Sequence, residues 1–455
     1  MRRTVLAALT GSALGIAAGA SAFAADIPAR AVLKAPPVPA FSWTGFYLGL
    51  YYGLGVSQSR GSDPRPVAPG VRLGSMDHIG RGLAGGVQVG YNWQFAPSWV
   101  FGVEGDIGYL GINRGQADYF DARATLGIKT SWLATLRGRI AYSTGPSLLY
   151  ITGGAAWLNV EDSLFDPVTG QSATSSKTRS GWTVGSGIET VLWGNWTNRT
   201  EYLYVDVGGG DTLVNTAGFV FSVNQHRFHV FKSALNYKFG APAAPMPAFN
   251  WTGFYVGLNG GLALAQLRGP EPTGTLFGEA NNNGWGFIGG IQAGYNWLWT
   301  PTIVVGVEGD INYVGINRSY REFNDIAIQG LKTSWLGTLR ARAGYNTGPA
   351  LLYFTGGAAF LHFEDSWNNA LTGASATSAK TKSGWAVGSG IETVLAGNWT
   401  TKAEYLFVSV GSGDNLIVPG TGLNLRVTEH KLHTFRWGLN YKFSGAPLVA
   451  PLVTK

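Results

Sequence analysis

Hydrophobic and polar residues alternate along much of this chain with the period of two that a β-strand imposes. The clearest case is 430–443, where one set of alternate positions is apolar: Phe435, Trp437, Leu439, Tyr441 and Phe443. The positions between them are polar or small: Thr434, Arg436, Gly438, Asn440 and Lys442. The stretches 304–313 and 335–345 alternate in the same way. The pattern predicts strands that each have one apolar and one polar face.

Such strands can be placed in two groups of eight. The first group is expected near 43–56, 82–94, 98–110, 130–142, 147–158, 181–191, 196–207 and 226–239. The second group is expected near 251–264, 286–298, 302–314, 333–345, 350–361, 384–394, 399–410 and 430–443. Short connections alternate with long ones, which is typical of an up-and-down outer-membrane barrel. The strands are also long enough for a tilted membrane crossing, which needs about 9–11 residues.

The two groups are copies of one another. The segment 40–50 returns at 248–258 with nine of 11 residues identical, and 129–158 returns at 332–361 with 22 of 30 identical. Each copy ends in Asn-Tyr-Lys-Phe, and a Pro-rich stretch precedes each copy. The offset of 208 residues between 40–50 and 248–258 far exceeds the 20–50 residues of a solenoid repeat. Each copy is therefore expected to be a complete domain.

The N-terminus has the character of a secretory signal peptide. Arg2 and Arg3 precede an apolar, Ala-rich run, and Ala22-Phe-Ala24 fits the small-residue cleavage pattern. The expected organisation is a signal peptide at 1–24, a Pro-rich periplasmic lead-in at 25–41, barrel copy one at 42–239, a Pro-rich linker at 240–249, barrel copy two at 250–443 and a C-terminal tail at 444–455.

Composition excludes two other classes of protein. Charged residues make up 13% of the chain, against about 25% in soluble domains, which is too few to cover a soluble protein of this size. Beyond the N-terminus, no uncharged apolar run approaches the ~20 residues of a membrane helix.

In a barrel, Trp residues at strand ends would form an outward aromatic girdle: Trp43, Trp93, Trp99, Trp132, Trp182 and Trp196. The sheet must close, because an edge cannot remain unpaired in lipid.

The polar faces carry charges of both signs, and these recur in both copies. By alternation the lumen of copy one is expected to hold Glu104, Asp106, Arg137, Arg139, Glu189, Arg199, Glu201 and Lys232. The lumen of copy two is expected to hold Glu308, Asp310, Arg340, Arg342, Glu392, Lys402, Glu404 and Arg436. A buried charge must be paired, or it costs several kcal/mol. The equal numbers of acids and bases favour a structural network in a narrow barrel over a selective pore, in which one sign would prevail.

Two further expectations concern neighbouring strands and strand ends. A turn centred on Gly194 places Glu189 opposite Arg199, and the turn at Gly397 gives the same geometry to Glu392 and Lys402. In each copy the Lys of the closing Asn-Tyr-Lys-Phe, Lys238 or Lys442, lies one residue from the strand end. These two lysines are expected to reach water.

No catalytic, cofactor or metal site is expected. Glu104 and Asp106 resemble a catalytic carboxylate pair, but arginines on a neighbouring strand favour salt bridges in both copies. His226 and His229 recur in copy two, and residues three apart on a strand lie on opposite faces, so a shared metal is not expected. The chain has no Cys, which excludes disulfides and Cys-based metal sites. Its net charge of +7 is not gathered into a Lys/Arg block, so nucleic-acid binding is not expected.

Several motifs occur once in each copy. They are Trp-Thr-Gly-Phe-Tyr at 43–47 and 251–255, Gly-Tyr-Asn-Trp at 90–93 and 294–297, Gly-Val-Glu-Gly-Asp at 102–106 and 306–310, Glu-Tyr-Leu at 201–203 and 404–406, and the closing Asn-Tyr-Lys-Phe. Together they resemble the alphaproteobacterial outer-membrane immunogenic proteins, a family often labelled "porin family" and similar to the eight-stranded transmembrane domain of outer-membrane protein A. The resemblance covers nearly all of both copies.

The resemblance implies a surface-exposed, often immunogenic barrel of a Gram-negative outer membrane. It also implies that Phe239 or Phe443 is the aromatic signal read by the barrel-assembly machinery. Members of the family usually have one copy. This chain has two copies and continues 12 residues past Phe443, so its last residue is not aromatic.

We therefore predict an all-β fold of two tandem eight-stranded antiparallel transmembrane β-barrels. The termini and linker would be periplasmic, and the long loops would lie outside the cell. The alternative is one 16-stranded barrel with the linker as a periplasmic turn. Two barrels are favoured because the charges balance within each copy.

The predicted function is a structural, surface-antigen and envelope-integrity role without chemistry, and the alternative is a passive diffusion porin for small hydrophilic solutes. The expected partners are outer-membrane lipid and lipopolysaccharide, the barrel-assembly machinery during biogenesis, and host or surface ligands bound by the loops.

Overall fold

The computed structural model describes most of the chain between the lead-in and the C-terminal tail. The described residues are 41–62, 66–68, 71–72, 75–117, 125–166, 169–214, 220–242, 249–270, 279–321, 327–369, 372–411, 414–417, 424–427 and 429–443. The predicted signal peptide, most of the lead-in, most of the linker and the predicted tail lie outside the described residues. No helix in the described part of the chain is both long and apolar enough to cross a membrane.

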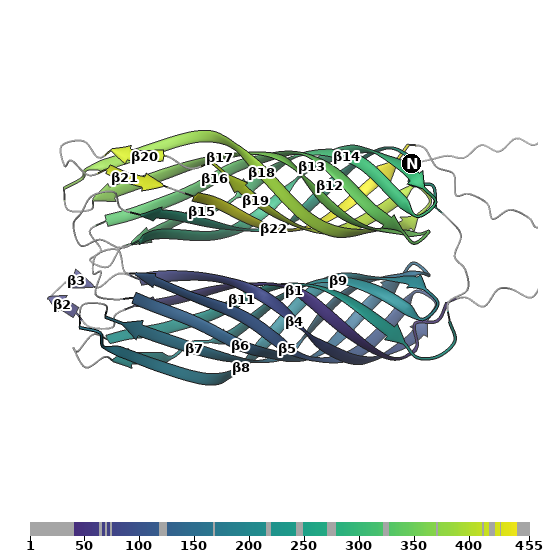
Figure 1. The fold of residues 1–455 in the computed structure, drawn as a ribbon, viewed down its shortest axis with the longest axis horizontal. Helices are drawn as coiled ribbons and strands as arrows, with labels where there is room; N and C mark the ends of the chain where they lie inside the picture. Colours follow the sequence, from purple (N-terminus) through teal and green to yellow (C-terminus); the bar gives the residue numbers. More distant parts are fainter. Residues whose placement is uncertain are drawn as a thin grey trace, which may run out of the picture. The chain divides into compact units, whose positions relative to one another are not determined.

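The first copy, called barrel 1 below, is a closed ring of antiparallel strands (Figure 1). In ring order these are β1 (Gly45–Ser62), β4 (Ser75–Ala96), β5 (Trp99–Ala117), β6 (Thr125–Ser143), β7 (Ser147–Phe165), β8 (Ser172–Trp193), β9 (Trp196–Gly208) and β11 (Val220–Lys238). The last strand pairs with the first, from Tyr47 opposite Lys238 to Ser62 opposite Ser222, and this seam closes the ring. Three short strands lie outside it: β2 (Pro66–Ala68) pairs with β3 (Val71–Arg72), and β10 (Asp211–Val214) pairs with β11.

The second copy, barrel 2, closes in the same way. Its ring consists of β12 (Gly253–Pro270), β13 (Glu279–Thr300), β14 (Ile303–Gly315), β16 (Ala327–Asn346), β17 (Ala350–Asn369), β18 (Ser375–Ala396), β19 (Trp399–Val410) and β22 (Glu429–Lys442). The short β15 (Asn317–Arg321) pairs with β16, and β20 (Asp414–Ile417) pairs with β21 (Asn424–Val427). The seam between β12 and β22 starts with Tyr255 opposite Lys442. Two separate closures confirm the two tandem barrels and exclude the single 16-stranded ring.

All the predicted strands are present, and most of them are longer than predicted at one end, although β19 ends at Val410 as predicted. We call the end with the short connections and the seam-starting residues the turn end, and the other the loop end. At the turn end the boundaries agree within about two residues; β9 starts at Trp196, for example. At the loop end β8 begins at Ser172 instead of 181, and β17 ends at Asn369 instead of 361. The ladders therefore extend well past the stretch that carries clear alternation.

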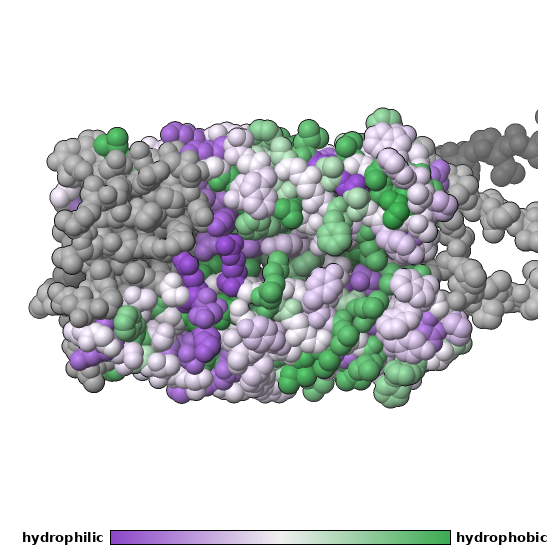
Figure 2. Space-filling model, viewed as in Figure 1, coloured by the Kyte–Doolittle hydropathy of each residue, from purple (hydrophilic) through white to green (hydrophobic). Residues whose placement is uncertain are grey.

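The outer wall of each barrel is apolar across its middle. Side chains such as Leu50 and Phe354 are 66% and 72% exposed on it, and Figure 2 shows apolar side chains spread over the strand walls. Trp93, Trp99 and Trp182 of the predicted girdle are also exposed on the wall, at 58%, 44% and 50%. Exposed apolar surface of this kind is what a lipid-facing barrel presents.

Two other girdle residues, Trp132 and Trp196, are partly buried. Trp43 is the exception. It is 1% exposed and faces inward, so its assignment to the outward girdle was wrong.

Candidate functional site

The charged residues predicted for the lumen of barrel 1 lie inside the ring, in one layer between its two ends. Each is at most 5% exposed: Glu104, Asp106, Arg137, Arg139, Glu189, Arg199, Glu201 and Lys232. Arg137 of β6 is central, because its Nη2 contacts Glu104 and lies 2.8 Å from Asp106 Oδ2. Its Nη1 lies 3.0 Å from Glu201 Oε2 on β9. One guanidinium therefore ties three strands together.

Cations from two more strands reach the same carboxylates of β5. Arg199 of β9 contacts Glu104, and Lys232 Nζ of β11 lies 3.2 Å from Asp106 Oδ2. The hydroxyl of Tyr47 on β1 donates a further hydrogen bond to Glu104. Charge-assisted hydrogen bonds of this kind are about twice as strong as neutral ones. The layer is thus cross-linked from several sides of the ring.

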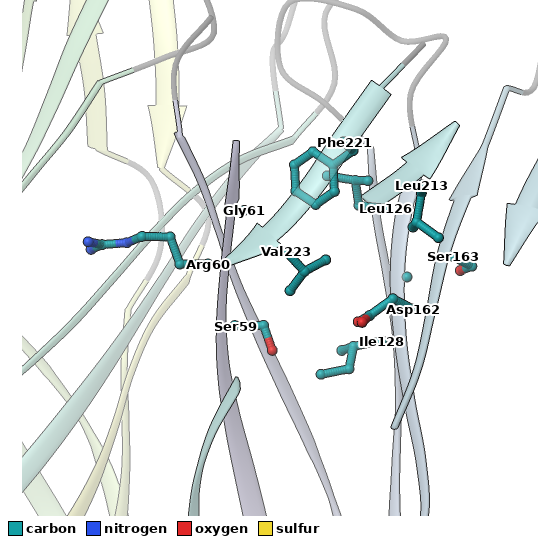
Figure 3. A pocket seen from close by; sticks show the side chains of 11 residues that line it. Ser59, Arg60, Gly61, Leu126, Ile128, Asp162, Ser163, Leu213, Phe221 and Val223 are labelled. Carbon is teal, nitrogen blue, oxygen red and sulfur yellow. The ribbon is translucent and has the colours of Figure 1, made fainter. Parts of the chain in front are cut away.

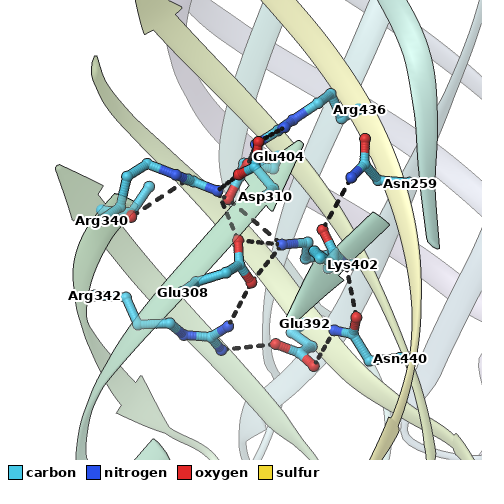
Figure 4. A network of polar contacts seen from close by, with 12 residues as sticks. Asn259, Glu308, Asp310, Arg340, Arg342, Glu392, Lys402, Glu404, Arg436 and Asn440 are labelled. Carbon is cyan, nitrogen blue, oxygen red and sulfur yellow. Dashed lines mark hydrogen bonds and ion pairs between the residues drawn. The ribbon is translucent and has the colours of Figure 1, made fainter. Parts of the chain in front are cut away.

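Barrel 2 has the equivalent ionic layer (Figure 4). Each of its members is at most 7% exposed: Glu308, Asp310, Arg340, Arg342, Glu392, Lys402, Glu404 and Arg436. Arg340 Nη2 lies 2.6 Å from Glu308 Oε1 and 2.8 Å from Asp310 Oδ2, and its Nη1 lies 3.0 Å from Glu404 Oε2. Lys402 Nζ lies 2.7 Å from both oxygens of Glu308. The structure thus brings together the residues that the alternation assigned to each lumen.

The backbone register at the short turns agrees with the sequence, but the ion pairs take other routes. Glu189 lies opposite Arg199, and Glu392 lies opposite Lys402. The Glu189 carboxylate nevertheless binds Arg139 of β6, with 2.9 Å from Oε2 to Nη1. Long inward side chains in a narrow ring can reach past a neighbouring strand, so this ion pair bypasses β7 and does not follow the β8–β9 ladder.

An apolar cork closes the turn end of barrel 1. Trp43 precedes β1 and turns into the mouth of the ring, where Gly45 adopts a φ of 136° that favours glycine. The indole packs against Val100 and Leu148, and its Nε1 donates a 2.9 Å hydrogen bond to Gly145 O of the β6–β7 turn. The residue that resembles a membrane-interface anchor in sequence therefore seals the lumen.

Barrel 2 has the same cork, and the corks also cover the two strand-end lysines. Trp251 is fully buried and donates a 3.0 Å hydrogen bond to Gly348 O. Lys442 is 1% exposed and donates to Trp251 O at 2.6 Å. Lys238 is 6% exposed, with its Nζ 5.4 Å from the centre of the Phe41 ring. The expectation that Lys238 and Lys442 reach water was wrong, because the segment before each first strand folds over them.

A second apolar layer fills the lumen on the loop side of the charges. In β5 the inward positions run from Val100 in the cork, through Glu104 and Asp106, to Leu110 and Ile112, which are both fully buried. In barrel 2 the inward apolar cluster includes Val314, Leu361 and Phe363. Sequence reasoning missed this layer, although the same alternation that located the carboxylates also points these residues inward. Each lumen is thus a packed core with charges between two apolar layers.

Nearer the loop end, a buried His–Asp pair joins distant strands. His226 Nε2 lies 3.0 Å from both carboxylate oxygens of Asp162 on β7, and Nδ1 lies 2.9 Å from Gly208 O on β9. Both ring nitrogens of His226 therefore lie within hydrogen-bond distance of oxygen atoms. In barrel 2 His430 Nε2 lies 3.0 Å from Asp365 Oδ2. Asp162 and Asp365 were not singled out in the sequence, because each is more than 60 residues from its histidine.

A small cavity adjoins this pair in barrel 1 (Figure 3). Its volume of about 20 Å³ is room for roughly one water molecule. Asp162 and Ser59 line it together with apolar side chains including Leu126 and Phe221. The buried Ser59 hydroxyl has no hydrogen-bond partner within the described residues. The cavity is therefore a small void in the core and not a channel.

The residues that resemble catalytic or metal-binding groups in the sequence have other partners in the structure. Among the described residues, no group of three or more His, Cys, Asp or Glu side chains is arranged to hold a metal ion. Glu104 and Asp106, which resemble a catalytic pair in sequence, both accept from Arg137. His229 lies on the outer face, where its Nδ1 is 2.7 Å from the Tyr202 hydroxyl, so it does not share a site with inward-facing His226.

The two aromatic residues predicted as assembly signals end the two rings. Phe239 N donates to Phe46 O at 2.9 Å, and Phe443 N donates to Phe254 O at 3.0 Å. Their side chains are 53% and 63% exposed. Each therefore continues its seam by one hydrogen bond and presents its ring outward. Their role as signals stays a prediction.

Comparisons with known proteins agree with this architecture. The family model described as "Outer membrane protein beta-barrel domain" matches twice, at residues 10–239 and 233–443. The 31 kDa outer-membrane immunogenic protein of Brucella melitensis is 36% identical over 213 residues, which cover 44% of this chain and 87% of that protein. The 22 kDa outer membrane protein of Rhizobium leguminosarum is 36% identical over 188 residues, covering 41% of this chain and 74% of that protein.

A third relative, the 25 kDa outer-membrane immunogenic protein of Brucella abortus, is 32% identical over 215 residues, covering 45% of this chain and 86% of that protein. Each relative thus corresponds to about one copy. The lipid-facing walls, the ring closures and these matches place the protein in the outer membrane of a Gram-negative bacterium. The chain belongs to the outer membrane protein beta-barrel domain family, of which it carries two domains in tandem.

Proposed function

We propose that the protein has a structural, surface-antigen and envelope-integrity role, in which each barrel is a solid membrane-spanning support. The observation that carries the proposal is the packed lumen. An ionic layer lies between two apolar layers in both barrels, and a Trp cork closes each turn end. Packing of this kind stabilises a barrel and leaves little room for solute.

The layers oppose solute passage for two physical reasons. An apolar constriction excludes water and ions by dewetting, and the corks around Trp43 and Trp251 are such constrictions. In the ionic layer, a passing solute would have to separate pairs such as Arg137–Glu201, and a buried charge left unpaired costs several kcal/mol. Both barriers lie in series along each lumen.

The loop end is the part of the protein that we assign to contacts outside the cell. The ladders extend there past the apolar wall, and the long connections leave from that end. The chain enters and leaves each ring at the turn end, which we place in the periplasm. On this proposal the aromatic and apolar walls contact lipid and lipopolysaccharide, the barrel-assembly machinery inserts the rings, and the loops meet host or surface ligands.

We further propose that the protein is not an enzyme. The carboxylates of the ionic layers are held by cations on other strands of the same ring, and both ring nitrogens of His226 face oxygen atoms. Neither arrangement leaves a free base beside a nucleophile. The matched relatives are named as outer-membrane or immunogenic proteins.

Conductance of the purified protein in planar bilayers tests the proposal. The full chain is expected to insert without steps above the lipid baseline, and liposomes containing it are expected not to take up small sugars. Insertion is checked by the slower migration of the unfolded form on gels run with and without heating. Regular conductance steps from the unmodified protein would favour the passive diffusion porin instead.

Envelope integrity is tested separately in cells. Loss of the protein is expected to raise sensitivity to detergent, and a copy carrying Trp43→Phe and Trp251→Phe is expected to restore resistance because the corks remain apolar. Unchanged detergent sensitivity in cells that lack the protein would remove the integrity part of the proposal.

A further inference from the structure

The outer wall of barrel 1 is uniform except on three neighbouring strands. On the described lengths of β1, β4, β5, β6 and β7, the outward positions across the middle of the wall hold only Gly, Ala, aliphatic and aromatic residues. Polar side chains interrupt this pattern on β8, β9 and β11, which are consecutive in the ring. The outward polar residues of these three strands are Ser186, Thr190, Asn198, Thr200, His229 and Ser233.

Barrel 2 repeats the pattern on the equivalent strands. The outward polar residues of its described middle wall lie on β18, β19 and β22: Ser389, Thr393, Thr401 and His433. A polar group in an apolar environment is costly unless it has a hydrogen-bond partner. We call the outward side of β8, β9 and β11 face 1, and that of β18, β19 and β22 face 2. The composition of both faces indicates a contact with protein instead of lipid.

Side chains on the two faces point outward and are nevertheless buried. Ile188 of β8 and Ile391 of β18 are both 0% exposed, and Phe231 of β11 is 7% exposed. On the walls formed by β5 and β14, by contrast, Ile107 and Ile311 are 53% and 54% exposed. Something therefore covers the two faces that does not cover the other walls.

An aromatic cluster joins face 1 to face 2. The ring centre of Tyr202 on β9 lies 4.7 Å from that of Phe435 on β22, and the ring centre of Phe231 on β11 lies 5.0 Å from that of Tyr405 on β19. Tyr405 is the copy-two equivalent of Tyr202, and Phe435 is the equivalent of Phe231. Each contact is thus the other with the copies exchanged. Such reciprocity is the mark of an isologous contact between two equivalent surfaces.

Hydrogen bonds join the same two faces. The indole Nε1 of Trp437 on β22 donates a 3.2 Å hydrogen bond to Ser186 Oγ on β8. The hydroxyls of Ser147, the first residue of β7, and Thr393 on β18 lie 2.6 Å apart. Two of the outward polar positions, Ser186 and Thr393, therefore have a hydrogen-bond partner on the other barrel.

We propose that face 1 and face 2 dock on each other, so that the two barrels are held side by side in the membrane as one paired unit. The partner of each face is the other barrel of the same chain, because the two faces carry equivalent residues and their contacts are reciprocal. The linker at 240–249 follows β11, a strand of face 1, and a short linker keeps two binding surfaces at high effective concentration. The inference does not rest on the proposed function.

Disulfide cross-linking of the full chain in liposomes tests the proposal. The chain has no Cys, so a variant carrying Ser147→Cys and Thr393→Cys has a single possible disulfide within one chain. A disulfide requires Cα atoms less than about 7 Å apart. We expect mild oxidation to join the barrels, so that the two halves stay together after cleavage at a protease site placed in 240–249. Ile107→Cys with Ile311→Cys, on exposed walls, is the matched control and is expected to give about tenfold less of this product.

A second substitution tests whether the fit of the two faces matters. Ile391→Trp places an indole where the native side chain is 0% exposed, while Trp remains compatible with a membrane-facing wall. In the Ser147→Cys and Thr393→Cys background we expect it to lower cross-linking about fivefold or more, because overpacking a filled site is unfavourable. Ile311→Trp, on an exposed wall, is expected to leave cross-linking unchanged. Gel migration with and without heating checks that each variant is folded.

Three results would overturn the proposal. The first is cross-linking between positions 147 and 393 that is no greater than in the control pair. The second is cross-linking that Ile391→Trp leaves unchanged. The third is a disulfide that mainly joins two chains, which would assign the faces to a second copy of the protein. None of these results bears on conductance or detergent sensitivity, so failure here is distinguishable from failure of the proposed function.

Discussion

The ionic layers of the two barrels use the same charges with two cations exchanged. Barrel 1 has Arg199 on β9 and Lys232 on β11, whereas barrel 2 has Lys402 and Arg436 at the corresponding positions. The acid partners stay the same: Arg199 and Lys402 both bind the first carboxylate of β5 or β14, and Lys232 and Arg436 both bind the second. The comparison shows that the layer requires a cation at each place, while the exact geometry of its head group can change.

The hydrogen-bond partners of Arg139 and of its counterpart Arg342 differ more between the two barrels. Arg139 donates through Nε and Nη2 to Asn92 Oδ1, at 3.1 and 2.8 Å. Its counterpart Arg342 donates to the Tyr255 hydroxyl at 3.1 Å instead, and both polar atoms of Asn296 lack a partner in the part of the chain that the structure describes. Barrel 1 is therefore better satisfied at this point. We expect differences in stability between the barrels to arise here and at the exchanged cations.

The largest expected effect comes from removing the shared central cation. Arg137→Ala leaves Glu104, Asp106 and Glu201 without their common partner, and breaking a buried ion pair costs about 3–5 kcal/mol. Barrel 1 is expected to lose about 4 kcal/mol of unfolding free energy, measured by denaturant titration of the full chain in detergent. The transition of barrel 2 should stay in place, and Arg340→Ala should reverse the pattern. Arg227→Ala, which breaks an ion pair on the outer face, is the control. If Arg137→Ala lowered the unfolding free energy as little as Arg227→Ala does, the prediction would be contradicted.

Removal of a cork tryptophan should have the next largest effect on stability. Trp43→Ala removes a fully packed indole and its hydrogen bond to Gly145, and large-to-small core changes of this type cost about 3 kcal/mol or more. The same substitution at Trp251 should have an equal effect on barrel 2, because the two corks are alike. Trp93→Ala, on the lipid-facing wall, is the matched control and should cost clearly less. Equal losses for Trp43 and Trp93 would mean that the cork is not part of the core.

The exchanged cations give a smaller effect that probes the comparison directly. Arg199→Lys alone gives up contacts to Gln88 and Glu104 and should cost about 1–2 kcal/mol, since Arg and Lys are not interchangeable at multidentate sites. Adding Lys232→Arg builds the arrangement of barrel 2, and we expect it to recover about half of that loss. Denaturant titration of the two single variants and the double variant measures the coupling. Strict additivity would show that the exchange is incidental.

The smallest effect should be a pH dependence confined to the loop end of barrel 1. Burial raises the pKa of Asp211, but hydrogen bonds from Lys177 and Arg179 outweigh it and leave the pKa below its usual value. The ion cluster therefore adds stability above the ordinary Asp pKa of about 3.9, and this stability is lost as the pH falls through the lower folded value. Amide exchange in β10 is expected to quicken between pH 5 and pH 2, by about tenfold at most. Asp211→Asn should remove that dependence, and a persisting one would assign it to another group.

The sequence predicted the turn end of the fold well because short, strongly marked turns define it. Pro97, Gly145 and Gly194 punctuate clear alternation, so strand starts such as Trp196 are found almost to the residue. At the loop end the strands leave the lipid, and stretches such as 172–179 alternate Ser and Thr with equally small or charged residues. Both faces are then polar or small, and the period of two disappears from the hydropathy although the ladder continues.

The alternation of inward and outward positions predicted which side chains lie in the lumen. It does not indicate which of these side chains are in contact. It placed Glu189 and Arg139 inside but not in contact, because the contact joins β6 to β8 past the intervening β7. It also misplaced Trp43, since a Trp before a strand can turn outward to the membrane interface or inward into the mouth. The inward turn depends on the positive φ at Gly45 and on the carbonyl of Gly145. Residue spacing does not reveal the conformation of Gly45, and Gly145 lies far from Trp43 in the sequence.

The seam has a consequence for how such a chain can grow. The first and last strands of each ring meet at the turn end, with Tyr47 opposite Lys238 and Tyr255 opposite Lys442. The chain therefore exits a finished ring beside the point where it entered, on the same side of the membrane. Duplication of the whole coding unit adds a second ring without opening the first, and a third could follow by the same step. A tandem array of this kind requires a fold whose first and last strands lie side by side.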